Sequence, residues 1–243
     1  MRKALNLFLA LVLYFSITII NVQLFLNPLV IPLFPSGYIR EHFWIRDYIH
    51  HFVQMFLALV VIVFILKGRF KDYGLNLQNW DLSKKYILWF FLVYGVFTAL
   101  NFLPNFLNGE PEPVNFSLTT FNILGWFSFT ALMSGTSEEI FFRGLLQTFL
   151  NKAWKGSVKI AQLNIPTAGI IAALIFTFAH MEFNFDPFAV SYNIPQLIVA
   201  FILGIFYSVA YDRSKSLIAP IVAHNYANFI MYFIGYLTII LFS

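Results

Sequence analysis

Two adjacent carboxylates and a guanidinium stand in an otherwise apolar stretch at residues 121–150: Glu138, Glu139 and Arg143. On membrane-insertion scales, each such charge near a helix centre costs roughly 2.5–3.5 kcal/mol. Charges that are kept at membrane depth generally belong to a functional site, and each needs a partner. This stretch is therefore the first candidate for chemistry in the chain.

Helix geometry predicts which of the two acids has a partner. Residues four apart lie on one helix face, so Glu139 and Arg143 are expected to pair. Glu138 is turned about 100° away from Glu139 and is left without that partner. An unpaired carboxylate in a poorly solvated site is suited to act as a general base. Two structural interpretations compete with this one.

In the first competing interpretation, Thr136 and Glu139 form a capping box at a helix start, after a break at residues 134–135. In the second, Glu139 and Arg143 form a purely structural ion pair within a bundle. A cap would explain Glu139 but not Glu138 or Arg143. An ion pair would leave Glu138 unexplained.

Further polar side chains occur in later apolar segments. His180 follows Phe176 by one helical turn, and His224 precedes Asn228 by one turn. Alone, each could be a satisfied histidine or an interhelical hydrogen bond. With Glu138 they come from three helices, and lipid cannot satisfy any of them. A carboxylate, two imidazoles and a carboxamide can activate a water and stabilise an oxyanion.

Three other histidines fit this scheme less well. His50 and His51 precede the second apolar segment and lie close to Arg46, so we expect them at the membrane interface. His42 lies in the same loop, and the sequence names no partner for it.

The composition identifies the class of protein that must position these groups. Of the 243 residues, 60% are hydrophobic and only 11% are charged. Soluble domains have about 45–50% apolar and about 25% charged residues, so the chain is a polytopic membrane protein. Its length suits a single integral membrane domain over residues 1–243. The absence of cysteine excludes disulfides and thiol nucleophiles.

The apolar segments predict an all-α transmembrane helical bundle of about seven to eight spans, with a polar catalytic cavity inside it. The first segment resembles a signal peptide, but residues 20–23 offer no small-residue cleavage site, so we expect a retained span. A re-entrant segment near residues 24–34, or one within the long fourth span, would make eight. The seven expected spans are residues 4–20, 53–66 (or from nearer His50), 86–103, 119–150, 166–181, 194–211 and 217–242.

Basic residues alternate between the ends of these spans. One set of ends carries twelve, and the other carries only Arg40 and Arg46; Arg143 within the membrane completes the total of 15. Cytoplasmic loops carry the excess of lysine and arginine, so this bias predicts a cytoplasmic N-terminus. We therefore attribute the net charge of +4 to the membrane topology, and no nucleic-acid partner is expected.

At these residues the chain resembles the CAAX-protease and bacteriocin-processing (CPBP) family of intramembrane glutamic endopeptidases, which are related to type II CAAX prenyl endopeptidases. The resemblance lies in three motifs in family order: Glu-Glu-x-x-x-Arg from Glu138, Phe-x-x-x-His from Phe176, and His-x-x-x-Asn from His224. It divides the chain into N-terminal spans at residues 1–70 and a catalytic core at residues 71–230.

The resemblance implies a role for each motif residue. Glu138 and His180 would activate a water, and His224 and Asn228 would bind the oxyanion. Supporting roles fall to Glu139, Arg143 and Phe176. No cofactor is expected, although the older description of such enzymes as zinc metalloendopeptidases keeps open a zinc ion bound by Glu138, His180 and His224. Lys215 stands where many members have glycine, which predicts a change at the mouth of the site.

The sequence therefore predicts an intramembrane endopeptidase of a prokaryotic cell membrane. Its expected partners are membrane lipid and a peptide or membrane-protein substrate, lipidated or not. The main alternative is a non-catalytic membrane scaffold or a bacteriocin self-immunity protein, as some relatives are described. A proton-coupled transporter would also tolerate buried Glu, Arg and His, but the chain lacks the internal repeat that many transporters show.

Overall fold

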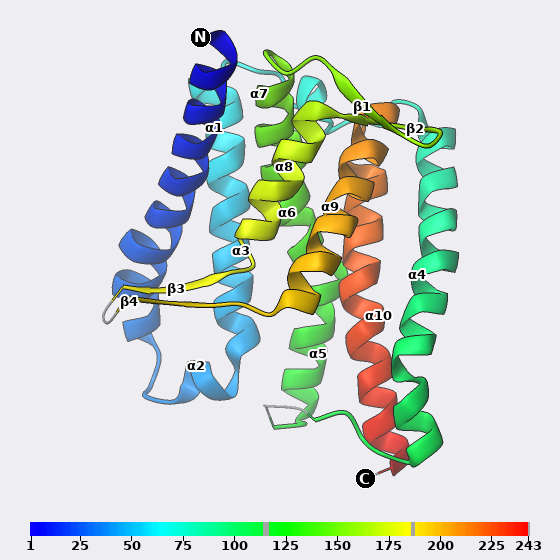
Figure 1. The fold of residues 1–243 in the computed structure, drawn as a ribbon. Helices are drawn as coiled ribbons and strands as arrows, with labels where there is room; N and C mark the ends of the chain where they lie inside the picture. Colours follow the sequence, from blue (N-terminus) through cyan, green and yellow to red (C-terminus); the bar gives the residue numbers. More distant parts are fainter. Residues whose placement is uncertain (114–116, 186–187, 243) are drawn as a thin grey trace.

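The protein is described here by a computed structural model that covers residues 1–113, 117–185 and 188–242. Long helices run side by side through its whole height, and the two termini lie at opposite ends (Figure 1). The predicted helical membrane bundle is confirmed. Five helical runs are long and apolar enough to cross a membrane: Arg2–Leu33, Phe43–Ile65, Trp80–Asn108, Ile194–Ser214 and Ile218–Phe242.

The first of these runs is continuous beyond its expected end. Helix α1 (Arg2–Ile19) passes into a π-helical segment (Ile20–Val30) and a 3₁₀ turn (Ile31–Leu33). Residues 24–34 thus prolong the first span instead of forming a separate re-entrant segment. A short helix α2 (Tyr38–Glu41) then leads into α3 (Phe43–Val60), which ends in a π-helical segment (Val61–Ile65).

Helix α3 begins ten residues earlier than the span predicted from residue 53. The charged and polar residues near its start lowered the local hydropathy and hid its first turns. A 3₁₀ turn (Phe70–Tyr73) then precedes α4 (Trp80–Asn108), which is also longer than expected at both ends.

The segment with the two acids lies in one unbroken helical run. It is composed of α5 (Thr120–Ser128), a π-helical segment (Phe129–Met133), α6 (Ser134–Glu139), a second π-helical segment (Ile140–Gln147) and α7 (Thr148–Asn151). The side chain of Thr119 caps its start by accepting from the Asn122 N–H. The capping box at Thr136 is therefore wrong. Such π-helical segments frequently occur at functional sites.

Two short β-hairpins interrupt the later helices and were not predicted. Strands β1 (Ser157–Ile160) and β2 (Leu163–Pro166) pair antiparallel before α8 (Thr167–Phe178). Strands β3 (Glu182–Phe185) and β4 (Phe188–Ser191) pair after it. Helix α8, with 12 residues, is about 18 Å long and is too short to cross a bilayer alone.

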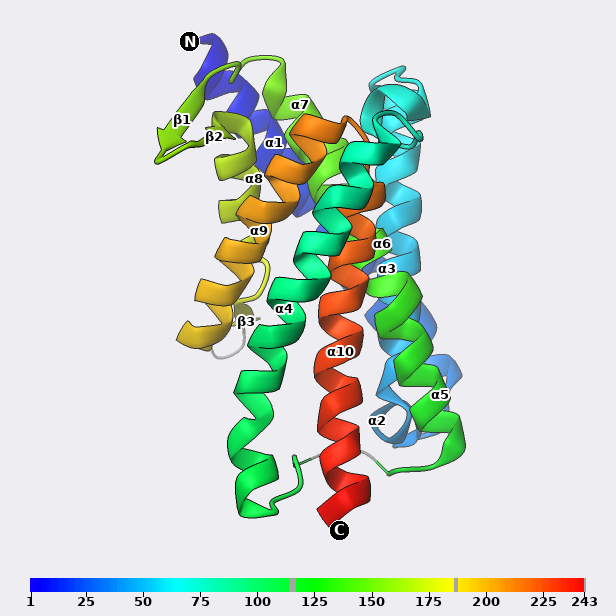
Figure 2. The same ribbon diagram turned by 90° about the vertical axis from the view of Figure 1, so that its right-hand side faces the viewer.

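Helices α9 (Ile194–Ser214) and α10 (Ile218–Phe242) complete the bundle. Helix α9 packs closely on α8, and α10 lies between α4 and the run that begins with α5 (Figures 1 and 2). Gly135 on α6 permits a close approach to α10, because a Cβ there would stand 2.8 Å from the Asn225 backbone nitrogen and from the His224 Cβ. Real side chains do not approach backbone so closely.

Lys215 ends α9 in the left-handed region, with φ of 57°. Glycine adopts this conformation without steric cost, which explains why glycine suits the position. Lys215 is bound to Asp212 at the helix end (Nζ–Oδ1, 3.0 Å). The departure from the family pattern therefore concerns a helix cap, and not the mouth of the site as the sequence suggested.

Candidate active site

A buried ion pair forms the centre of the site. The Arg143 Nη1 donates to Glu139 Oε1 at 2.9 Å, and both side chains are fully buried. This confirms the pairing predicted from their spacing of four. The same carboxylate oxygen accepts from His224 Nδ1 at 2.8 Å. Because a carboxylate can only accept, Nδ1 of His224 carries a proton and Nε2 points away from Glu139.

The guanidinium of Arg143 is held between helices by more than its carboxylate. Its Nη2 donates to the Gly204 carbonyl at 3.1 Å. The Phe176 ring lies 4.6 Å from its central carbon, and the Tyr207 ring lies 5.3 Å away. Such faces stabilise a desolvated cation. Arg143 therefore joins the α6 run to α8 and α9 and fixes the position of Glu139.

Tyr207 also holds an imidazole of the site. Its ring stacks on His224, with centroids 4.9 Å apart and planes at 14°. Tyr207 is fully buried on α9, between His224 and Arg143. The sequence does not single out Tyr207, because nothing distinguishes this tyrosine from the other aromatic residues of an apolar helix.

Glu138 lies between two imidazoles. Its Oε1 is 3.8 Å from His51 Nε2, and its Oε2 is 3.7 Å from His224 Nε2. Its side chain is 18% exposed, whereas that of Glu139 is completely buried. Both distances exceed a direct hydrogen bond, and polar contacts of this length are commonly bridged by water. The acid that the spacing left without an arginine is thus the more accessible one.

The position of His51 corrects the interfacial role that the sequence suggested for it. His51 lies in the third turn of α3 and its side chain is only 12% exposed. Its backbone carbonyl accepts from Ser137 Oγ at 2.8 Å, and that hydroxyl accepts from Gln54 at 3.2 Å. These bonds fix α3 against α6. The signal that could have found His51 was a helix starting at Phe43 instead of Val53.

His50, its neighbour, faces elsewhere. Its ring nitrogen Nδ1 is 3.1 Å from the Asn21 amide, and its carbonyl accepts from the same amide at 2.9 Å. His42 lies 2.6 Å from the Asn122 carboxamide oxygen. Both therefore join helices near the α2 end of the bundle.

His180 lies at the end of α8, beside the same aromatic ring as His224. The Phe176 ring is 4.7 Å from the His180 ring and 5.7 Å from the His224 ring. His180 Nδ1 donates to the Phe176 carbonyl at 2.8 Å, which leaves Nε2 unprotonated and available. Among the described residues, no hydrogen bond or ion pair joins His180 to Glu138.

Asn228 extends the site along α10. Its Nδ2 donates to Ser134 Oγ at 2.9 Å, one helical turn before Glu138. The neighbouring amide of Asn225 accepts from the Gly135 N–H at 2.8 Å. These two contacts hold α10 in register against α6, so that His224 and Glu139 meet.

No group of three or more His, Cys, Asp or Glu side chains within residues 1–113, 117–185 and 188–242 is arranged to hold a metal ion.

Residues 120–230 match the family model described as Type II CAAX prenyl endopeptidase Rce1-like. The similarity to this family covers 111 of the 243 residues. The resemblance seen in the three motifs is thereby confirmed over the stretch that holds all of them. The Rce1-like segment contains Glu138, His180, His224 and Asn228, and it leaves His51 outside. No curated protein and no solved structure matches the chain.

Proposed function

We propose that this protein is an intramembrane endopeptidase that hydrolyses peptide bonds by an activated water. One observation carries the proposal: the carboxylate of Glu138 lies between two imidazoles inside a bundle, within a segment that matches an endopeptidase family. Such a group, held where water is scarce, has the chemistry of a general base.

In the proposed first step, a water at Glu138 attacks the carbonyl carbon of the substrate. Glu138 takes the proton that the water loses, and Nε2 of His180 accepts a hydrogen bond from the same water. The hydrogen bond from Nδ1 of His180 to the Phe176 carbonyl supports this role, because it leaves Nε2 as the basic nitrogen. A positioned general base of this kind contributes roughly 10²–10⁴-fold to a rate.

In the proposed second step, His224 and Asn228 stabilise the oxyanion of the tetrahedral intermediate. Glu139 accepts from Nδ1 of His224 and so holds the ring with Nε2 toward Glu138; when Nε2 carries a proton, it can donate to the oxyanion. Removing one oxyanion donor costs roughly 10²–10³-fold in rate. The intermediate then collapses: the carbon–nitrogen bond breaks, the amine takes the proton from Glu138, and the new carboxyl group keeps the oxygen of the water.

The proposed setting is a prokaryotic cell membrane with the N-terminus in the cytoplasm. The strong bias of basic residues supports this orientation. The proposed substrates are membrane-associated peptides or proteins, lipidated or not. The family's description as a prenyl endopeptidase supports a substrate that reaches the site from the bilayer.

The test compares the wild type with Glu138→Gln in host membranes. Peptides released into the medium and membrane proteins that stay uncleaved would be identified by mass spectrometry, and the best substrate would be repeated in proteoliposomes. We expect Glu138→Gln to abolish cleavage of that substrate. Glu110→Gln, which changes an exposed carboxylate in a loop, is the matched control and should cleave normally.

Cleavage that persists in correctly inserted Glu138→Gln protein would contradict the proposal. The same assay separates the zinc alternative. Activity that survives exhaustive dialysis against a chelator supports the metal-free mechanism, and activity that is lost and then restored by zinc overturns it.

A further inference from the structure

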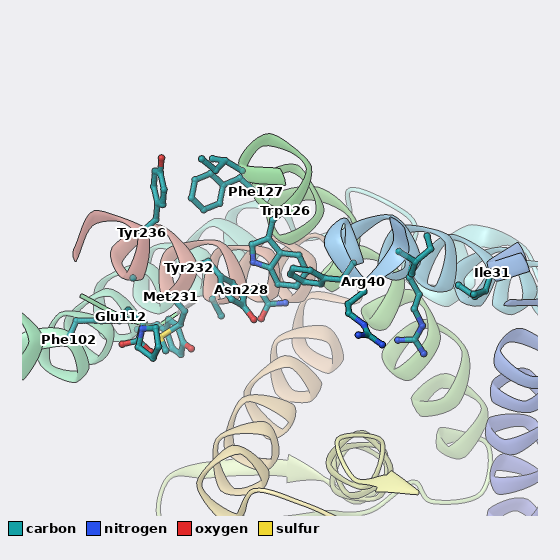
Figure 3. Close-up of a pocket in the computed structure, with 18 of the residues that line it drawn as sticks. Ile31, Arg40, Phe102, Glu112, Trp126, Phe127, Asn228, Met231, Tyr232 and Tyr236 are labelled. Atoms are coloured by element: carbon teal, nitrogen blue, oxygen red, sulfur yellow. The ribbon is translucent and has the colours of Figure 1, made fainter. Parts of the chain in front are cut away.

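A cavity of about 1010 Å³ opens beside the site, in the half of the bundle that contains α2 and the C-terminus. Its walls come from α2, α3, α4, α5 and α10. Seven of the 19 residues that line it are aromatic, among them Trp126, Tyr232 and Tyr236 (Figure 3). Asn228 lines the cavity and also donates to Ser134, one helical turn before Glu138. The cavity therefore borders the proposed site at Asn228, whereas Glu138, His180 and His224 are not among the residues that line it.

Two arginines line one part of this cavity, Arg40 from α2 and Arg46 from α3. Figure 3 shows Arg40 with its guanidinium at the cavity, far along it from Glu112. Both arginines are exposed, and neither forms a salt bridge within the described part of the chain. By contrast, Arg69 on the opposite end binds Asp72 at 2.8 Å.

The charge pattern of the chain makes these two residues exceptional. The twelve basic residues at the other ends of the spans follow the positive-inside bias, and Arg40 and Arg46 are the two that oppose it. Both of them line the same cavity. The cavity, and not the membrane topology, therefore explains the positions of Arg40 and Arg46. Free guanidinium groups at an apolar cavity are suited to bind a carboxylate, often by two parallel hydrogen bonds.

We propose that the cavity receives the peptide substrate and that Arg40 and Arg46 bind a carboxylate of that peptide. The proposal rests on the proposed function, because it makes the cavity the approach to Glu138. A peptide is the occupant we propose, because Asn228 of the proposed peptidase site lines this cavity, and binding of an anionic lipid is the competing outcome of the test. The carboxylate belongs to an acidic side chain or to the C-terminus of the peptide.

The experiment measures binding, which does not require cleavage. Full-length Glu138→Gln protein in phosphatidylcholine nanodiscs would be titrated with ten-residue peptides that carry a dabcyl quencher. The peptides differ only by Glu or Gln at one position and by a free or an amidated C-terminus. Binding is read from quenching of tryptophan fluorescence, and Trp126→Phe shows how much of the signal arises in the cavity.

We expect the peptide with the free carboxylate to bind about tenfold more tightly than its neutral partner, as charge-assisted hydrogen bonds do. The double variant Arg40→Gln/Arg46→Gln should lose this preference. The double variant Arg69→Gln/Arg213→Gln removes the same charge from the opposite end and should keep it. The amidated and Gln peptides then tell which carboxylate is bound, and either answer supports the proposal.

Equal binding of all peptides by the parent protein, or a preference that survives Arg40→Gln/Arg46→Gln, would overturn the inference. So would a preference that a few per cent of phosphatidylglycerol in the nanodisc abolishes through the same arginines, because the cavity would then be a lipid site. A cooperative unfolding transition in detergent verifies that each double variant is folded. Charge-selective binding without any cleavage in the wild type would instead count against the proposed function alone.

Discussion

The two adjacent glutamates have different surroundings, and this difference supports a structural role for Glu139 and a catalytic role for Glu138. Glu139 is fully buried, and its Oε1 accepts from both Arg143 and His224, so its charge is paired with a buried cation, although its Oε2 has no hydrogen-bond partner among the described residues. Glu138 lies 3.8 and 3.7 Å from two imidazoles, which is too far for a direct hydrogen bond, and its side chain is partly exposed. A carboxylate that is paired with a buried cation stabilises the fold, whereas a carboxylate without a cation partner can accept a proton in a reaction.

Substitution at the buried pair should therefore affect stability more than substitution at Glu138. Arg143→Leu leaves Glu139 buried without its cation, and removal of one partner of such a pair costs about 3–5 kcal/mol. Glu138→Gln keeps the shape of a partly exposed side chain and should change the free energy of unfolding by less than about 0.5 kcal/mol. Urea unfolding in detergent, followed by tryptophan fluorescence, measures both values.

If Arg143→Leu unfolds at the same urea concentration as the wild type, the pair does not have the structural role given to it here. The double variant Glu139→Leu/Arg143→Leu is the informative control. It removes both charges, so it should be more stable than Arg143→Leu alone.

His51 was not singled out by its sequence, but its imidazole lies against the proposed catalytic acid. We expect His51→Gln to lower the cleavage rate by less than the roughly 10²–10⁴-fold that a general base supplies, because other groups still hold Glu138. Since Glu138 loses one of its two imidazole neighbours, the dependence of the rate on pH should also change. His50→Gln, one residue away and bonded to Asn21, is the matched control and should leave both unchanged.

A merely structural His51 would give a different pattern. The unfolding midpoint of His51→Gln would then fall while the pH profile of its remaining activity kept its shape. His51→Gln and His50→Gln would then differ only in stability.

The contacts of these residues show what the sequence could predict. The Glu139–Arg143 pair lies within one helix, so the period of the helix was sufficient to find it. The contacts of Glu138 with His51 and of Glu139 with His224 join different helices. They depend on the rotation and depth of each helix in the bundle, which hydropathy does not specify.

At the scale of the elements, hydropathy predicted the membrane helices well and their ends poorly. Helix α3 starts at Phe43 because a helix can continue through polar residues where a neighbouring helix binds them, as Ser137 binds the carbonyl of His51. The hairpin β3–β4 was missed because strand and loop are hard to distinguish in four-residue segments.

The contact of α6 with α10 depends on the absence of a side chain at Gly135. Gly135→Val should force α10 outward, since its Cβ would lie 2.8 Å from the backbone of Asn225. His224 and Asn228 both belong to α10, and a displacement of about 1 Å can cost roughly 10²-fold in rate. We expect a loss of that order in the cleavage assay, while the amount of protein in the membrane is kept.

The control is Gly156→Ala, where the nearest atom to an added Cβ is 3.5 Å away, an ordinary contact. It should cleave at the normal rate. Full activity in Gly135→Val would show that the site does not need this close approach between the two helices.

For the whole molecule, the arrangement of charges predicts which end faces the cytoplasm. The N-terminus and the β1–β2 hairpin lie at one end, and the loop after α4 lies at the other with the C-terminus (Figure 1). The first end carries twelve basic residues and the second carries two. The positive-inside rule therefore predicts that Lys155 is cytoplasmic and Glu110 is outside.

The absence of cysteine makes this prediction directly testable, because a single introduced thiol has no background. We expect a membrane-impermeant maleimide to label Glu110→Cys in intact cells, and to label Lys155→Cys only after permeabilisation. Both positions are exposed, so each thiol is accessible once the reagent reaches it. The reverse pattern would place Arg40, Arg46 and their cavity in the cytoplasm, against a bias of twelve to two. The expected pattern opens the cavity to the outside, so that the proposed site would admit peptides from the face opposite to the basic loops.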